Sequence, residues 1–317
     1  MDKKLELIIK NGIVFYQNKF QKVNIVIDKG KIIEINKKLK SNKAKKIIDA
    51  KNKTIIPGII DIHFHVRAPS FPERGTVESE TKAAAKGGIT TLFEMPISNP
   101  CMSNAAEFAS RKKHFLENTF INFAFIPALG KLTDLNLQNL VNSGAIAFKV
   151  FTIAPPPNRK SEFNGLCFTT EEKILKALKH AKKSNLITIF HAEDQLMLDS
   201  HKQYENKYKK NDPRIHNATR PIIAEASAIS KILHLNSIVK TKIHIAHVTS
   251  ELSLDVISYF QKKGQDISAE TCPHYLFKTE KDVIKVGPYG KINPPIRSKN
   301  DQNKLWKGIK NKTLTIV

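Results

Sequence analysis

The chain has 317 residues, of which 41% are hydrophobic and 26% are charged. This length allows one large α/β domain and a smaller one. No uninterrupted apolar run reaches the roughly 18 residues that cross a membrane, and the N-terminal residues lack the apolar segment of a secretory signal. Three widely spaced cysteines agree with a reducing compartment. We therefore expect a cytoplasmic protein without a membrane partner.

The formal net charge is +23, because 52 Lys and Arg residues outnumber 29 Asp and Glu residues. The excess is spread along the chain, for example over 37–46 and 207–210, without interleaved aromatic residues. No sequence signature of a helix-turn-helix, a zinc finger or an RNA-recognition domain accompanies it. We expect no nucleic-acid partner, and the charge favours small anionic molecules by long-range attraction.

The first part of the chain predicts short β-strands. Residues 5–12, 23–28 and 31–35 alternate or cluster β-branched residues, and Asn-Gly and Lys-Gly pairs between them predict turns. We expect a small, sandwich-like β domain over residues 1–56.

From residue 57 the pattern changes to alternating strands and helices. Helices are expected over 76–86 and 170–184, the second with a capped start at Thr169 and Thr170. The expected strands are 59–63, 90–94, 122–126, 145–151, 186–191, 242–247 and 266–270, with a last one that starts at 313. Eight strands at this spacing predict an α/β fold, a TIM-like (β/α)8 barrel over 57–317 that is truncated in its last strand.

The most informative motif is His63-Phe-His65, at the end of an apolar strand. Side chains at i and i+2 of a strand point to the same face, so the two imidazoles can bind one metal ion. In a barrel, this strand end lies at the mouth where active sites form. The alternative is an exposed strand end with two unrelated histidines.

Three further residues close predicted strands on the same face. His191 and His247 end two of them, and Lys149 lies inside an apolar strand. An ammonium is expensive to bury, and a buried lysine can react with carbon dioxide to give a carbamate, an anionic ligand that bridges two metals. Alternatively, the histidines pack in the core and the lysine reaches the surface. We expect His244, three residues before His247, to point to the opposite face and to serve packing. Imidazole and oxygen donors suit zinc, with cobalt or manganese as alternatives.

These motifs occur in an order that resembles the amidohydrolase superfamily, in particular its cyclic-amide branch of allantoinase, dihydroorotase and hydantoinase. The matching segments are 57–67, 87–91, 95–96, 148–151, 191–193, 247–250, 270–276 and 293–297. The resemblance implies hydrolytic opening of a ring amide by two zinc ions bridged by carboxylated Lys149. It places His63 and His65 on one metal, and His191 and His247 on the other. It also implies a small cyclic amide or ureide substrate and a homo-oligomer.

These motifs are compatible with more than one substrate. Arg67 resembles the arginine that follows the two histidines in dihydroorotases and could bind a substrate carboxylate, or it could form a surface salt bridge. Arg67, Asn99 and Asn293 are the candidate substrate contacts. The segments 148–151 and 270–276 look more like allantoinase, which is our first expectation. The alternatives are a dihydroorotase, which interconverts N-carbamoyl-aspartate and dihydroorotate, and a hydantoinase or dihydropyrimidinase.

The end of the chain departs from the family pattern. The family has an aspartate at the end of the eighth strand that acts as general base, and we expect it just beyond Val317; the segment that completes the small β domain is missing as well. We therefore expect the chain as given to be inactive. If the protein truly ends at Val317, a non-catalytic scaffold relative is the alternative.

Overall fold

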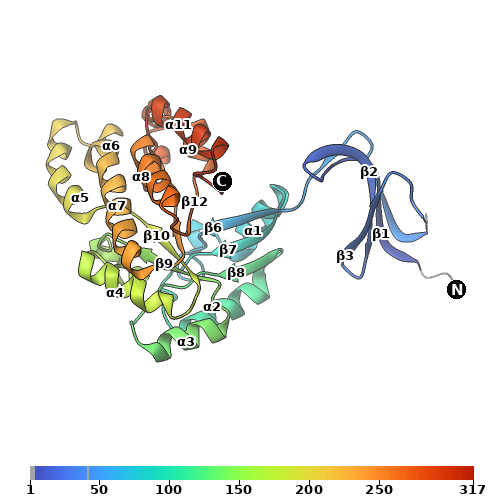
Figure 1. Ribbon diagram of the computed structural model, residues 1–317, viewed down its shortest axis with the longest axis horizontal. Helices are drawn as coiled ribbons and strands as arrows, with labels where there is room; N and C mark the ends of the chain where they lie inside the picture. The colour runs from blue at the N-terminus through green and yellow to red at the C-terminus, as the bar shows by residue number, and fades with distance from the viewer. Residues whose placement is uncertain (1–3, 41–42) are drawn as a thin grey trace. The chain divides into compact units, whose positions relative to one another are not determined.

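The computed structural model describes residues 4–40 and 43–317. Its contacts divide the chain into two compact units, Met1–Ile59 and Ile60–Val317 (Figure 1). The boundary expected from the sequence, between 56 and 57, lies a few residues earlier.

The N-terminal unit is a five-stranded sheet. Its strands are β1 (Leu5–Tyr16), β2 (Lys19–Asp28), β3 (Lys31–Asn36), β4 (Ala44–Asp49) and β5 (Thr54–Ile55). The order is β3-β2-β1-β4, and β5 also pairs with β1. Val14, Val23 and Ile25 form the centre of its small core.

The Asn-Gly pair that was expected to form a turn forms a bulge within a strand instead. Asn11 and Gly12 lie inside β1, where the register against β2 shifts between Ile9 and Gly12 and Asn11 has a φ of 62°. A Cβ atom on Gly12 would lie 2.3 Å from the side chain of Ile55, so the close approach of β5 explains the glycine. The tight turn between β1 and β2 is made instead by Gln17 and Asn18, which both have positive φ.

The second unit alternates strands and helices, as the sequence predicts. Its strands are β6 (Ile59–Phe64), β7 (Ile89–Glu94), β8 (Asn122–Phe125), β9 (Ala147–Phe151), β10 (Ile187–His191), β11 (Ile243–Ile245) and β12 (Ile267–Ala269). Its α-helices are α1 (Val77–Lys86), α2 (Ala105–Asn118), α3 (Asp134–Ser143), α4 (Glu171–Lys182), α5 (Gln195–His201), α6 (Arg214–Thr219), α7 (Ile222–Val239), α8 (Glu251–Lys262), α9 (Pro273–Phe277), α10 (Glu280–Val286) and α11 (Lys299–Lys310). Four 3-10 helices complete it: η1 (Pro72–Arg74), η2 (Pro157–Phe163), η3 (Lys202–Lys207) and η4 (Gly287–Gly290).

The strands neighbour one another in chain order. They form the sheets β6-β7-β8 and β9-β10-β11-β12, and parallel bridges from Phe125 to Ala145 and from Ala128 to Lys149 connect the two. Ile316 forms a parallel bridge with Glu270, so the last residues begin an eighth strand beside β12. The α/β fold is confirmed, whereas pairing of this end with β6, which would close a barrel, is not seen in the described residues.

Helices cover the outer side of the strands (Figure 1), and most of the core lies between the two layers. Several helices start at a residue whose side chain accepts a backbone N–H of the first turn, including Thr170 of α4, as expected, and Ser250 of α8. The segment Arg214–Val239 is long and apolar enough to cross a membrane, but half of it is buried. A helix in the core of a globular protein can have the same length and apolar composition. The helix α7 contributes Ile229, Ile232 and Leu233 to the core.

Phe115 gives a direct test of this packing. Its fully buried ring contacts Phe123 and Phe125 at centroid distances of 5.4 and 5.2 Å, whereas its neighbour Leu116 is exposed. We expect Phe115→Ala to lower the free energy of unfolding by about 3–5 kcal/mol, because it leaves a cavity. Leu116→Ala is the matched control and should change it by less than about 0.5 kcal/mol. Urea unfolding measures both, and equal losses would contradict the packing described.

Candidate functional site

The histidines singled out in the sequence come together at the ends of neighbouring strands. His63 lies in β6, and His65 is the first residue after this strand. His191 is the last residue of β10, and His247 lies two residues after the end of β11. The ring of His63 lies 5.3 Å from those of His65 and His247, and the rings of His191 and His247 are 4.7 Å apart. Segments separated by more than 180 residues thus meet in one cluster.

Two carboxylates orient this cluster. The Nδ1 atom of His63 contacts Glu270, and the Nε2 atom of His191 lies 2.7 Å from Glu193. Because an ionised carboxylate only accepts hydrogen bonds, each contacting nitrogen carries the proton. The other nitrogen, Nε2 of His63 or Nδ1 of His191, is left with its lone pair. Such a contact fixes the tautomer of a metal-binding histidine.

The position of Lys149 in β9 matches the sequence prediction of a buried lysine. It is fully buried, and its Nζ atom has no hydrogen-bond partner among the described residues. Burial lowers the pKa of this amine to about 8, and the nearby Glu270 opposes the shift only partly. An unpaired ammonium is unfavourable here, so the site suits a neutral amine or an amine converted to an anionic ligand.

The expectation for His244 was wrong. It contacts Ser268, and its Nε2 atom lies 3.2 Å from Glu270, the carboxylate that also binds His63. Side chains no longer alternate between faces here, because β11 ends at Ile245 and His247 has a φ of 41°. The backbone thus leaves the strand between the two histidines, and both residues contact Glu270, His244 through its ring and His247 through its backbone N–H at 3.2 Å.

Two arginines, one directly and one through the other, hold Glu193, the carboxylate that contacts His191. Arg220 binds both oxygens of Glu193, and Arg297 donates to the backbone oxygen of Arg220 at 2.6 Å. Burial by itself would raise the pKa of the Glu193 carboxyl, but His191 and Arg220 outweigh it and hold this pKa at about 2. Glu193 is therefore a fixed negative charge beside His191.

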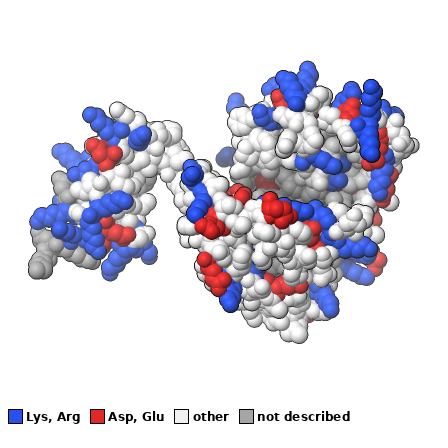
Figure 2. Space-filling model, turned by 180° about the vertical axis from the view of Figure 1, so that it is seen from behind, with Lys and Arg blue, Asp and Glu red and all other residues white. Residues whose placement is uncertain are grey.

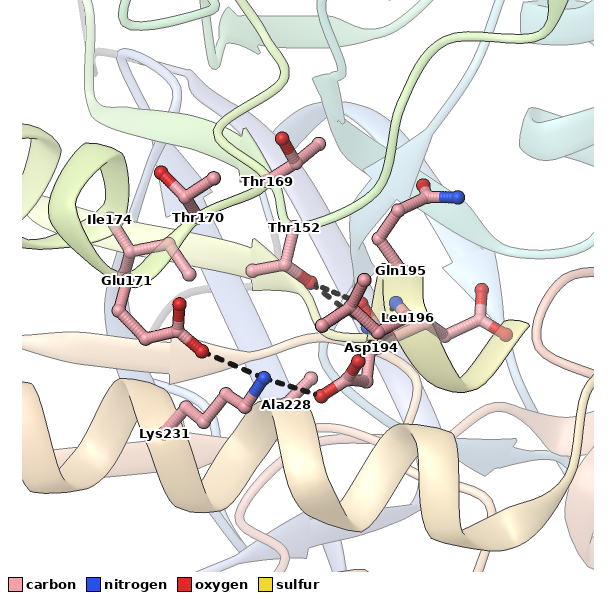
Figure 3. Close-up of a pocket in the computed structure, with 11 residues that line it drawn as sticks. Thr152, Thr169, Thr170, Glu171, Ile174, Asp194, Gln195, Leu196, Ala228 and Lys231 are labelled. Carbon is pink, nitrogen blue, oxygen red and sulfur yellow. Dashed lines mark hydrogen bonds and ion pairs between the residues drawn. The ribbon is translucent and has the colours of Figure 1, made fainter. Parts of the chain in front are cut away.

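The loop that carries Glu193 is also held from its other side. A pocket of about 160 Å³ lies there. Lys231 of α7 bridges Glu171 and Asp194 at 2.8 and 2.7 Å, and Figure 3 shows the three side chains side by side. Asp194 also accepts the N–H groups of Leu196 and Met197 at the start of α5. Because the lysine is already paired with two carboxylates, we interpret this pocket as a structural support of the loop.

The three predicted substrate contacts lie on different loops. Arg67 is partly buried and donates to the backbone oxygen of Ile97 at 2.9 Å, and the exposed Asn99 accepts from the hydroxyl of Ser70 through its backbone oxygen. The loops after β6 and β7 are thus joined. Asn293 is exposed on the loop before α11, and no contact between it and the histidine cluster is seen in the described residues.

A buried contact between an arginine and a glutamate fixes the loop after His65. Arg111 of α2 donates to the backbone oxygens of Val66 and Ala68 and to Glu94 at 2.5 Å. Glu94 in turn accepts the N–H of Val66 at 3.1 Å. Burial raises the pKa of the Glu94 carboxyl to about 7, although Arg111 opposes the shift.

The donor set fits a metal site in its chemistry. Several imidazoles and a lysine lie near one another, and the Nδ1 atoms of His65 and His247 are buried with no hydrogen-bond partner among the residues that the structure describes. In the described part of the chain, no three His, Cys, Asp or Glu side chains are already arranged as metal ligands. Instead, Nδ1 of His191 and Nε2 of His247 lie 3.0 Å apart, so two potential ligand atoms point at each other. Imidazole nitrogens and a carbamate oxygen are typical zinc ligands.

Comparisons with known proteins agree with the motifs. The chain is 31% identical over 315 residues to an allantoinase of Bacillus licheniformis, an alignment that covers 98% of this chain and 68% of the relative. The chain belongs to the cyclic-amide branch of the amidohydrolase superfamily. An allantoinase of Escherichia coli O1:K1 is 28% identical, with 96% of this chain and 67% of the relative covered. The family model "Dihydro-orotase-like" matches residues 52–147.

Solved structures show the same relationship. The L-hydantoinase (dihydropyrimidinase) of Arthrobacter aurescens superimposes with a TM-score of 0.89 at 26% identity, over 98% of this chain and 68% of that protein. The family membership expected from the motifs is thus confirmed. The chain spans about two thirds of the length of these amidohydrolases.

Glu270 and Glu193 belong to the site but were not among the residues expected from the sequence. Glu270 opens the segment 270–276 and Glu193 lies two residues after His191, so both are in segments that matched the family. A carboxylate often accompanies a metal-binding imidazole, and this rule could have drawn attention to both glutamates. The sequence could not show that Glu270 pairs with His63, because the two residues are 207 positions apart.

Glu94 predicts an unusual pH dependence of stability. The folded protein holds the proton on this carboxyl up to a pKa of about 7, whereas the unfolded chain releases it near the ordinary value. Ionisation of Glu94 therefore lowers the free energy of unfolding as the pH rises from the unfolded pKa to the folded pKa. Relative to Glu94→Gln, the wild-type protein should lose roughly 3 kcal/mol between about pH 4 and about pH 8.

Urea unfolding across this pH range measures the difference. The exposed Glu78→Gln in α1 controls for the loss of a glutamate. If the difference between wild-type protein and Glu94→Gln is constant with pH, or grows as the pH rises, the assignment is wrong.

Proposed function

We propose that this protein hydrolyses a C–N bond in a cyclic amide and opens the ring, with allantoin as the first candidate substrate. The observation that carries the proposal is the convergence of four histidines near a buried lysine amine that has no hydrogen-bond partner in the described part of the chain. The relationship to allantoinases over nearly the whole chain supports it. Dihydroorotate and hydantoins or dihydropyrimidines are the alternatives.

The proposed metal site consists of His63, His65, His191 and His247, with Lys149 as a carboxylated bridge between two zinc ions. Zinc ions bound there would lower the pKa of a water molecule and polarise the ring carbonyl. Glu270 and Glu193 hold the protonated nitrogens of His63 and His191, so the free nitrogens of these two rings would be available to the metals. Neutral imidazoles are required for this role, and burial lowers the pKa of both histidines.

Arg67, Asn99 and Asn293 are the proposed substrate contacts. Burial lowers the pKa of the Arg67 guanidinium only to about 10, so it keeps its charge at neutral pH. Its contact with Ile97 holds it over the loop that carries Asn99. By the same family resemblance, an aspartate at the end of the eighth strand, which begins beside β12, would be the general base. A homo-oligomer in the cytoplasm is part of this proposal.

Lys149→Ala tests the proposed bridge. The substitution removes the carbamate, so the protein in its complete length should bind well under half of the zinc of the wild type and lose at least about a hundredfold in kcat/KM. Metal content is measured after dialysis, and hydrolysis is followed with allantoin, hydantoin and dihydroorotate. Lys176→Ala, at an exposed lysine of α4, is the matched control and should retain both properties.

Two results would contradict the proposal. Full zinc content and activity in Lys149→Ala would remove the lysine from the site. A wild-type protein, in its complete length, that binds no zinc and opens none of the three rings would favour the scaffold relative instead.

A further inference from the structure

A single buried arginine joins three loops beside the proposed metal site. Arg297 ends the segment 293–297, one of those that match the family, and only 6% of it is exposed. The basic side chains visible in Figure 2 lie at the surface among acidic ones, where water solvates their charge. A buried guanidinium has lost this solvation, so other groups of the protein must stabilise it.

The first contact of Arg297 reaches the loop after β10. Its Nη1 atom donates to the backbone oxygen of Arg220 at 2.6 Å. The side chain of Arg220 in turn binds both oxygens of Glu193, the carboxylate that contacts His191. Because the bond from Arg297 fixes the backbone from which the Arg220 side chain extends, it restricts where this guanidinium can hold Glu193.

The second contact of Arg297 reaches the loop after β11. Its Nε atom donates to the hydroxyl oxygen of Thr249 at 3.1 Å, and Thr249 lies two residues after His247. The hydroxyl of Thr249 donates to one oxygen of Glu225 at 2.5 Å, and its N–H donates to the other oxygen at 3.0 Å. Burial lowers the pKa of Arg297, and the buried Glu225 is the strongest of the charges that oppose this shift. The loop after β11 is therefore held between Arg297 and a carboxylate of α7.

The two contacts lead to one pair of proposed ligands. By the family resemblance, His191 and His247 share a metal ion, and Nδ1 of His191 lies 3.0 Å from Nε2 of His247. Arg297 contacts the two loops with different nitrogens of one rigid, planar group. A lysine amine could not replace it, because a single point donor cannot reach both acceptors in this geometry. The loop that follows the other proposed ligand pair is held by a different arginine, Arg111.

We propose that Arg297 is a positioning residue, which holds the loops after β10 and β11 together and so keeps His191 and His247 at the separation that one metal ion requires. The inference rests on the proposed metal site and goes beyond it, because Arg297 contacts neither ligand itself. Asn293, a proposed substrate contact, lies four residues earlier on the same segment. Arg297 therefore also connects this segment to the two ligand loops.

Hydrogen exchange of the complete, zinc-free protein, measured by mass spectrometry, tests the connection between the loops. Arg297→Lys keeps the positive charge but loses the guanidinium fork. In this variant, the peptides 191–195 and 247–251 should exchange at least about fivefold faster than in the wild type, because their loops open more often. The peptide 64–68, in the loop after β6, should change by less than about twofold.

Two further variants make the exchange result specific. Thr249→Val breaks only the second contact of Arg297, so it should accelerate exchange in the peptide after β11 and leave the peptide after β10 unchanged. Arg214→Met, at an exposed arginine that pairs with the neighbouring Asp212, is the control and should change none of the three peptides.

Zinc titration shows whether the connection matters for metal binding. Arg297→Lys should weaken the binding of at least one zinc ion about tenfold, since residues that orient metal ligands have effects of this size. Faster exchange with unchanged zinc affinity would make Arg297 a structural residue only, and equally faster exchange in all three peptides would indicate a general loss of structure. Either result overturns the proposal. If the complete wild type binds no zinc, the proposed function fails, and the exchange rates alone decide whether Arg297 holds the two loops.

Discussion

The contacts between buried carboxylates and imidazoles are the constraint on which this structure depends. Four histidines and a lysine are brought into one apolar region, where each polar atom without a partner costs free energy. Glu270 and Glu193 relieve part of this cost and at the same time set the orientation of His63 and His191. The remaining unsatisfied atoms, above all Nζ of Lys149, are at the centre of the proposed metal site.

The rest of the second unit positions these groups. Parallel strands bring their C-terminal ends to one side, so side chains from β6, β9 and β10 meet there. The loops after the strands are then fixed individually: Arg111 holds the loop after β6, and Lys231 holds the loop after β10. Such supports restrict the motion of residues that must keep their geometry for function.

The positively charged side chains fall into two groups in the structure. The lysines are scattered along the chain, and a few of them pair with a single neighbour, as Lys82 does with Glu78. Arg67, Arg74 and Arg159 differ, because they gather partly buried charge around Glu162, at loops that leave the proposed ligand strands. Net charge alone could not distinguish these arrangements, since it says nothing about where charges meet.

The sequence by itself determined the alternation of strands and helices, the strand bounds of the second unit to within a few residues, and the family. It could do so because the hydrophobic period and the histidine and lysine motifs are local. The tertiary structure alone decided the bulge at Asn11 and Gly12, the placement of His244 and the pairing of Glu270 with His63. These features depend on the close approach of β5 and on the point where β11 ends. Contacts between residues distant in the chain leave no periodic signal in it.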